Sequence, residues 1–218
     1  MLRKFGVKFN LQRFNFNKNM KKLTFALLIF LHISVNSQET KLLSSKDFQE
    51  DLNNTFRDAK KSPLTSEDFA NFKSLNFFPI NDKLVVQGKF VLDSRDKVYK
   101  MKTSTARIAE YRQYATVYFT INEQELSLPV YQSVDHSKHI GYENYLFLPF
   151  TDLTNGSETY GGGRYLDMTI PKGTNILLDF NRAYNPYCAY SDRYSCPIVP
   201  TENNLNIDIK AGIMKWHD

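Results

Sequence analysis

Long apolar runs are scarce in this sequence of 218 residues. One run of eleven residues, 23–33, lies near the start, and it is too short to cross a bilayer core of about 30 Å as a helix. Two lysines precede it, and small residues follow at the positions of a cleavage site (Lys21, Lys22, Val35 and Ser37). This pattern is typical of a secretory signal peptide that starts at Met20. We therefore expect residues 1–37 to be an upstream extension plus a signal peptide, and the protein to be exported, either periplasmic or secreted.

Acidic residues are missing from that leader, and this distorts the charge of the whole chain. Residues 1–37 hold seven of the 28 Lys and Arg residues and none of the 23 Asp and Glu residues. The remaining 181 residues therefore carry 21 basic and 23 acidic side chains, a net charge near −2. Proteins that bind nucleic acid usually carry excess Lys and Arg, so we predict no nucleic-acid partner. We also predict no stable membrane insertion after signal cleavage.

Cysteine is nearly absent as well, since the chain has only Cys188 and Cys196. Neither lies near the predicted cleavage site, which argues against a lipid anchor. In an exported protein a close pair of cysteines predicts a disulfide, worth about 2.6 kcal/mol in the chain-entropy model. Two alternatives stay open: a thiol activated by a nearby arginine, and a metal site that recruits two histidines (Arg182 or Arg193; His136 and His139). We predict neither a metal nor a cofactor.

Residues 38–80 show a helical pattern that ends at a proline and then resumes. Apolar side chains at every fourth position form one stripe (Phe48, Leu52 and Phe56). Capping residues are expected at the start of this helix and of a shorter one after the proline (Ser44 with Asp47; Pro63; Thr65 with Asp68). The segment is interpreted as two short helices that pack on the rest of the protein.

From residue 81 the apolar period shortens to two, which is typical of half-buried strands. The segments that show it, or that are continuously apolar, are 84–92, 115–121, 125–130, 145–150, 175–180 and 205–211. The first segment puts four apolar residues on one face, interrupted by Gly88 where a bulge or a close neighbour would fit (Leu84, Val86, Phe90 and Leu92). The pattern predicts a mainly β fold: a single antiparallel barrel or sandwich-like sheet with two short N-terminal helices. We expect residues 38–80 and 81–218 to form one folded unit.

Polar residues are densest in residues 150–204. Three glycines at 161–163 precede Arg164, and they fit either a structural turn or an anion site, although the spacing of a phosphate-binding loop is absent. Asp179 and Asn181 share one face of a predicted strand, about 6 to 7 Å apart. Buried polar groups need partners, and Arg164 is the expected one for Asp179. A structural salt bridge and a ligand-binding network both remain open.

Four blocks carry a resemblance to a known family: "TYGGGRYLD", "DFNRAYNPYCAY", "CPIVPTEN" and "IKAG". They are similar to the signature blocks of the bacterial family grouped as domain of unknown function 1684, for which no activity, substrate or cofactor is established. The resemblance also implies that the motif includes three prolines (Pro186, Pro197 and Pro200). This chain departs from the family pattern at Tyr187, where a second proline is frequent, and at Ile213, where Glu is usual. Because family members that look cytosolic also carry both cysteines, a thiol or structural role for them stays open.

The sequence favours an exported small-ligand-binding β-barrel, with a small molecule as candidate partner. The predicted ligand-binding residues come from the polar blocks (Tyr160, Gly161, Gly163, Arg164, Asp179, Asn181, Asn185, Glu202 and Asn203). One alternative is a structural or surface-interaction protein in which these residues only order a loop. Another is a hydrolase-like enzyme, although no nucleophile–base pair can be named. The sequence does not indicate an oligomeric state.

Overall fold

Two short helices open the described part of the chain. The structure is a computed structural model that describes residues 44–217, which lie in one compact unit. Helix α2 spans Ser45–Arg57 and helix α3 spans Ser66–Asn71. The predicted extension and signal peptide lie outside the described residues. Within residues 44–217, no helix is long and apolar enough to span a membrane.

Both helices begin at the capping residues that the sequence predicts. Ser44 Oγ accepts a hydrogen bond from the backbone N–H of Asp47 at 3.2 Å, and Thr65 Oγ1 accepts one from that of Asp68 at 3.1 Å. Each side chain satisfies a first-turn amide that has no partner within the helix. At the other end of α2, Phe56 is buried against Tyr190 with ring centroids 4.7 Å apart. The helical segment is thus packed against the C-terminal third of the chain.

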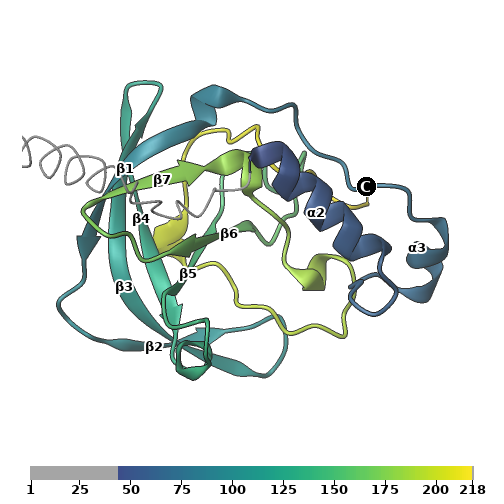
Figure 1. Ribbon diagram of the computed structural model, residues 1–218, viewed down its shortest axis with the longest axis horizontal. Coiled ribbons are helices and arrows are strands. Elements are labelled where there is room, and N and C mark those ends of the chain that lie inside the picture. The colour runs from purple at the N-terminus through teal and green to yellow at the C-terminus, as the bar shows by residue number, and fades with distance from the viewer. Residues whose placement is uncertain (1–43, 218) are drawn as a thin grey trace, which may run out of the picture. The chain divides into compact units, whose positions relative to one another are not determined.

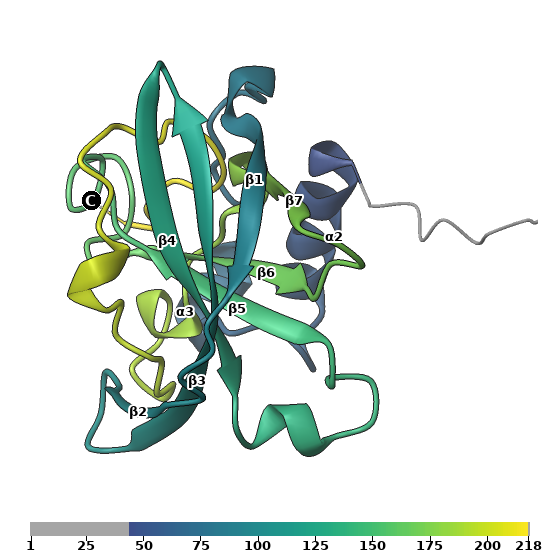
Figure 2. The same cartoon turned by 90° about the vertical axis from the view of Figure 1, so that its left-hand side faces the viewer.

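Seven antiparallel strands form one sheet that curls into a half-barrel (Figures 1 and 2). The strands are β1 (Val85–Leu92), β2 (Val98–Lys102), β3 (Ile108–Ile121), β4 (Gln124–Ser133), β5 (Tyr145–Phe150), β6 (Arg164–Thr169) and β7 (Asn175–Asp179). Their order is β6-β5-β4-β3-β1-β7, and β2 pairs with β3 beside this series. Short 3₁₀ helices lie before β1 (η1, Asp82–Leu84), between β4 and β5 (η2, His136–Lys138) and after β7 (η3, Phe180–Arg182; η4, Tyr187–Ala189; η5, Thr201–Asn203). The mainly β, antiparallel fold with two short helices is confirmed.

Strand β3 shows how the alternating pattern builds the sheet. Its inward side chains are all buried, as predicted (Ala115, Val117, Phe119 and Ile121). A Cβ at Gly88 on neighbouring β1 would lie 2.4 Å from Val117 Cγ1, so the glycine admits a close neighbour. Leu92 stands opposite inward-facing Ala115, on the predicted face, but it is 64% exposed at the end of β1. The alternating apolar pattern therefore extends to the end of β1, although the core does not cover the last residue of the strand.

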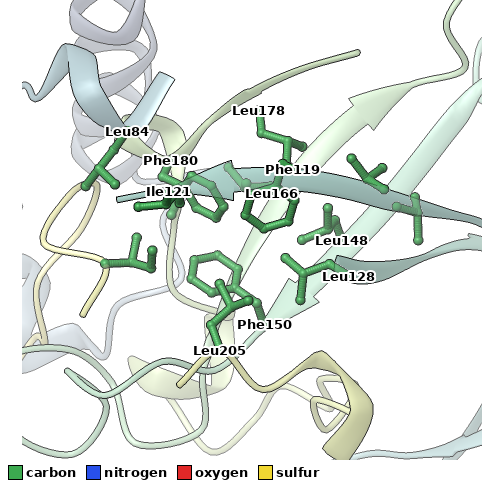
Figure 3. Packing of buried hydrophobic residues seen from close by; sticks show 14 of the residues in the cluster. Leu84, Phe119, Ile121, Leu128, Leu148, Phe150, Leu166, Leu178, Phe180 and Leu205 are labelled. Carbon is green, nitrogen blue, oxygen red and sulfur yellow. The ribbon is translucent and has the colours of Figure 1, made fainter. Parts of the chain in front are cut away.

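The core fills the concave side of the half-barrel (Figure 3). It joins side chains from nearly every strand with others from beyond the last strand (Leu84, Phe119, Leu128, Leu148, Phe150, Leu166, Leu178, Phe180 and Leu205). Strand β5 is buried on both faces, as its continuously apolar sequence predicts. The predicted final strand over 205–211 is wrong, because this segment is irregular although Leu205 and Ile209 are buried. Strands β2 and β6 were not predicted.

Candidate functional site

Arg164 is completely buried at the start of β6, and its partner is not the predicted one. Its Nη2 atom lies 2.7 Å from Asp152 Oδ2, and both side chains have no solvent exposure. The guanidinium also donates to the backbone carbonyls of Ile209, Ala211 and Ile213. Burial lowers the pKa of Arg164, and the Asp152 carboxylate opposes this effect. The predicted pair with Asp179 is therefore wrong, because the irregular C-terminal segment offers carbonyls that a strand would have used for its own ladder.

Asp179 and Asn181 do not share a strand face, because β7 ends at Asp179 and Asn181 lies in η3. Asp179 instead caps η3 by accepting from the backbone N–H of Asn181 at 3.0 Å, and it accepts from Ser45 Oγ of α2 at 2.6 Å. Asn181 is fully buried, and its side chain exchanges hydrogen bonds with the backbone N–H and C=O of Asn81 at 2.8 and 3.0 Å. These two residues fix α2 and the chain before η1 to the end of β7.

The remaining polar motif residues also make bonds within the protein. Asn203 is fully buried and donates from Nδ2 to the carbonyls of Pro129 and Pro149 at 2.8 and 2.7 Å. Asn185 Nδ2 donates to the carbonyl of Met214 at 3.0 Å. Glu202 Oε1 accepts a long hydrogen bond of 3.4 Å from the Tyr131 hydroxyl. These interactions attach the C-terminal segments to β4 and β5.

The glycine motif forms a turn before β6. Gly163 has φ +90°, and a Cβ there would lie 2.7 Å from the carbonyl oxygen of Phe150. A Cβ at Gly161 would meet its nearest neighbour only at 3.7 Å. The backbone N–H of Gly163 bonds to the carbonyl of Tyr160 at 3.1 Å, which closes the turn. The turn directs the chain into β6, and its tightest requirement is at Gly163.

Cys188 and Cys196 lie next to each other as free thiols. The backbone N–H of Cys188 donates to Cys196 Sγ at 3.2 Å. A side-chain hydrogen bond with Cys196 lowers the pKa of Cys188 to about 6, while burial opposes this. The Cys196 pKa is raised by the same bond. Burial and the nearby Cys188 raise the pKa of Tyr160 to about 12.

The disulfide stays a prediction, and residues 44–217 contain no cluster of three His, Cys, Asp or Glu side chains that could hold a metal ion.

A cleft of about 1010 Å³ opens beside this loop, and the sequence did not predict it. Of the residues predicted as a ligand site or disulfide, only Cys196 lines it. Its walls come from α2, from β2 to β6, and from the loops around η2, η4 and residues 194–197. The lining is rich in aromatic side chains (Phe48, Tyr111, Tyr145, Phe147, Tyr165, Tyr184, Tyr187 and Tyr194).

Five of these rings form a continuous series, here called the aromatic wall: Phe48, Tyr184, Tyr165, Phe147 and Tyr111. Successive ring centroids along this series lie 6.4, 5.9, 4.6 and 5.3 Å apart. Such distances allow edge-to-face and tilted ring contacts, which hold each ring in place. The Tyr165 hydroxyl donates to the carbonyl of Pro197, so the wall is also attached to the cysteine loop. The cleft therefore has a rigid apolar side.

Asp167 is an acidic residue of the cleft that is bonded to two tyrosines of its lining. It stands directly opposite Phe147 in the β5–β6 pairing, and its Oδ1 atom accepts hydrogen bonds from the hydroxyls of Tyr145 at 2.6 Å and Tyr184 at 2.5 Å. Asp167 is solvent-accessible through the cleft, yet protein atoms surround it closely. This partial desolvation raises its pKa, whereas the two phenol hydrogen bonds and Arg182 lower it.

Of the basic residues that line the cleft, Arg107 is held by acceptors within the protein. Arg107 donates from Nε to Ser195 Oγ at 3.0 Å and from Nη2 to the Ser195 carbonyl at 2.7 Å. Lys100 stands opposite Glu110 in the β2–β3 pairing. Arg107 thus binds the 194–197 loop, and Lys100 lies beside an acidic residue of the neighbouring strand. Asp167, by contrast, makes no ion pair within residues 44–217.

The sequence held a weak signal for this cleft. Tyr145 and Phe147 alternate along β5, and Tyr165 and Asp167 alternate along β6, so one face of two neighbouring strands carries aromatic rings and a carboxyl group. The sequence analysis instead predicted a ligand site at the glycine motif and Arg164. Because β6 was not predicted as a strand, the alternation after Arg164 was missed.

Comparison with known proteins matches the chain to a protein family but assigns it no activity. A family model described as "Protein of unknown function (DUF1684)" matches residues 70–214, which include all seven strands of the sheet. The solution NMR structure of an uncharacterised protein from Haloarcula marismortui is similar at 28% sequence identity and a TM-score of 0.61. That match covers 89% of this chain and 97% of the other. No curated protein matches the chain.

Proposed function

The chain belongs to the DUF1684 family of proteins of unknown function, and we propose that it binds a small organic molecule in the aromatic cleft. The observation that carries this proposal is the cleft of about 1010 Å³, in which a continuous aromatic wall lies beside an oriented carboxyl group. Ligand sites are typically concave, largely apolar and provided with a few fixed polar groups. The volume is at the upper end of the range of about 300–1,000 Å³ that is usual for such sites.

The motif residues predicted to bind the ligand take a supporting role in this proposal. Arg164 fixes the start of β6, the strand that carries Tyr165 and Asp167. Asp179 and Asn181 hold α2, which contributes Phe48 to the aromatic wall. Their buried hydrogen bonds therefore position the walls of the cleft and need no direct contact with a ligand.

We do not extend the proposal to a hydrolase. Ser195 Oγ accepts from Arg107 Nε, donates to Thr103 Oγ1 and shares a hydrogen bond with Thr105 Oγ1, so none of its partners is a histidine ring. Ser133 Oγ accepts from the backbone N–H of His136, and the ring is not its partner. A nucleophile needs a base within hydrogen-bond reach, and neither serine has one in this arrangement.

Export remains part of the proposal, and it depends on residues 1–37. If these residues act as a leader, the mature protein is expected to begin near residue 38 and to be found outside the cytoplasm. Sequencing the N-terminus of the protein from separated cell fractions tests this, and a full-length cytoplasmic protein would contradict it.

A neutral fluorescent probe, N-phenyl-1-naphthylamine, tests the binding proposal. We expect its emission to rise on binding to the wild type and to stay low with Ile108→Trp, because the larger ring narrows the cleft that Ile108 lines. Leu177→Trp is the matched control: Ile108 is 51% and Leu177 is 45% exposed, and Leu177 lies on β7 outside the cleft. Binding by the wild type and the control alone supports the proposal. Equal binding by all three proteins, or no binding by the wild type, contradicts it.

A further inference from the structure

Asp167 lines the cleft and uses only one of its two carboxylate oxygens in hydrogen bonds with described residues. Both phenol donors, Tyr145 and Tyr184, bond to Oδ1, and no described residue bonds to Oδ2. A carboxylate oxygen offers about two acceptor positions, so Oδ1 is saturated and Oδ2 keeps its full capacity. Asp167 makes no ion pair within residues 44–217, and the charge of Arg182 lowers its pKa without a hydrogen bond to it. A hydrogen-bond donor from a ligand can therefore reach Oδ2.

The rings around this carboxylate favour a positively charged ligand. The face of an aromatic ring carries negative charge density, so cations are attracted to it when they lie within about 6 Å of its centre. The aromatic wall lies on one side of the cleft, and one of its rings, Phe48, already has the guanidinium of Arg182 5.1 Å from its centre. The Asp167 carboxylate and the aromatic rings therefore both favour a cationic ligand over a neutral or anionic one.

An anionic ligand would meet less favourable surroundings. Arg107 is engaged with the side chain and carbonyl of Ser195, and it would have to give up these bonds to reach an anion. An anion close to the aromatic wall would also be repelled by Asp167. We therefore expect the cleft to bind cationic ligands more tightly than anionic ligands of similar shape.

From this geometry we propose that the cleft selects organic ammonium ligands, whose N–H group donates to Asp167 Oδ2 while the attached apolar group lies against the aromatic wall. This inference rests on the proposed function. Ammonium is favoured over guanidinium because a guanidinium fork needs two free carboxylate oxygens to bind with both its donors. Since Oδ1 is already saturated by two tyrosines, only a single-point contact is offered.

Three competitors of similar shape test the selection by charge. Phenethylammonium, 2-phenylethanol and 3-phenylpropanoate are each titrated against bound N-phenyl-1-naphthylamine at neutral pH. We expect the ammonium to compete about tenfold more strongly than the alcohol, since a charge-assisted hydrogen bond exceeds a neutral one, and the carboxylate to compete least. Phenethylguanidinium is expected to gain no advantage over the ammonium. An ammonium that competes no better than the alcohol overturns the inference.

Asp167→Asn separates this inference from the proposed function. The variant should still bind the neutral probe but lose the preference for ammonium over alcohol. Asp208→Asn removes one exposed negative charge outside the cleft and should keep that preference. If the wild type fails to bind the neutral probe, the proposed function fails. If the probe binds and Asp167→Asn retains the full preference, only the ammonium inference fails.

Two further readouts guard against misfolding and against other charges. Because desolvation raises the pKa of Asp167, folding disfavours its charged form at neutral pH, so Asp167→Asn should unfold at no lower denaturant concentration than the wild type. In the wild type, the ammonium preference should disappear as Asp167 is protonated at low pH, while binding of the alcohol persists. The charged or titratable groups that surround Asp167 or line the cleft are Lys100, Arg107, Glu110, Tyr111, Asp135, His136, Tyr145, Tyr165, Arg182, Tyr184, Tyr187, Tyr194 and Cys196. A preference that survives protonation of Asp167 would contradict the assignment to this carboxylate.

Discussion

Arg164 and Asp152 form an ion pair of 2.7 Å in which neither side chain touches solvent. Arg164 is the largest fully buried side chain of the described residues, and it also bonds to carbonyls of the irregular C-terminal segment. Asp152 Oδ1 accepts from the backbone N–H and hydroxyl of Thr154, so the acid orders the loop after β5 as well. One pair therefore connects the start of β6, this loop and the end of the chain.

Breaking this pair should destabilise the protein strongly. Asp152→Asn leaves the Arg164 charge buried without its counter-charge, and we expect a loss of about 3–5 kcal/mol in the free energy of unfolding. Glu158→Gln is the control, because the Glu158–Lys210 pair is exposed and should contribute less than about 1 kcal/mol. Urea denaturation followed by circular dichroism measures both. A loss for Asp152→Asn as small as that of the control would show that the pair has no structural importance.

The two glycines of the predicted ligand motif should respond differently to alanine. Gly163→Ala places a Cβ at φ +90° and 2.7 Å from the Phe150 carbonyl oxygen, and we expect it to cost about 1–3 kcal/mol or more. Gly161→Ala meets nothing closer than 3.7 Å and should be nearly neutral. Thermal unfolding of the two variants compares them directly. Equal effects would mean that the backbone conformation at Gly163 is not the cause.

The sequence predicted those parts of the fold that depend on local patterns. Alternation identified β3 and β7, continuous apolarity identified β5, and local capping chemistry identified both helix starts. The sequence-based prediction was wrong where contacts with residues far along the chain determine the conformation. Residues 205–211 read as a strand, but their carbonyls bind the Arg164 side chain, and no neighbouring strand takes them into a ladder. These contacts join residues 45 and 47 positions apart, so the apolar periodicity of the segment does not reveal them.

The cysteine pair allows a test of the predicted disulfide. Protein isolated from its native compartment without reduction, then alkylated, should show both cysteines blocked and a mass two hydrogens lower than the dithiol. Denaturation before alkylation ensures that burial does not mimic protection. Alkylation at both positions would exclude the disulfide and leave the free thiols that the structure shows.

In the reduced protein, Cys188 should be the reactive thiol. Its pKa is lowered to about 6 by the hydrogen bond with Cys196, so the thiolate forms as the pH rises through about 6 and is present at neutral pH. The rate of modification by iodoacetamide should rise through that range. Cys196→Ala removes the hydrogen bond and should move the midpoint of this profile to higher pH. An unchanged midpoint would contradict the proposed cause.

The position of the candidate site could be predicted only in part from the sequence. Of the residues predicted as a ligand site or disulfide, only Cys196 lines the cleft, and the polar side chains make internal hydrogen bonds, as Asn203 and Asn181 illustrate. The cleft instead depends on tyrosines that read as ordinary strand residues, since a ring that lines a cavity and a ring that fills a core have the same period. Only the curvature of the sheet and the position of α2 separate the two cases.

The hydrogen bonds from Tyr145 and Tyr184 should control the charge of Asp167. Each phenol stabilises the carboxylate, so Tyr145→Phe or Tyr184→Phe should raise the pKa of Asp167 further, by about a tenfold decrease in its acid dissociation constant. Carbon-13 NMR of the Asp167 carboxyl group across pH measures this. Tyr142→Phe is the control, because its ring contacts Tyr145 at 6.0 Å without bonding to Asp167. With the higher pKa, the preference for phenethylammonium should vanish at a higher pH than in the wild type. A lower pKa in either variant would mean that the phenols do not hold Asp167 in its charged form.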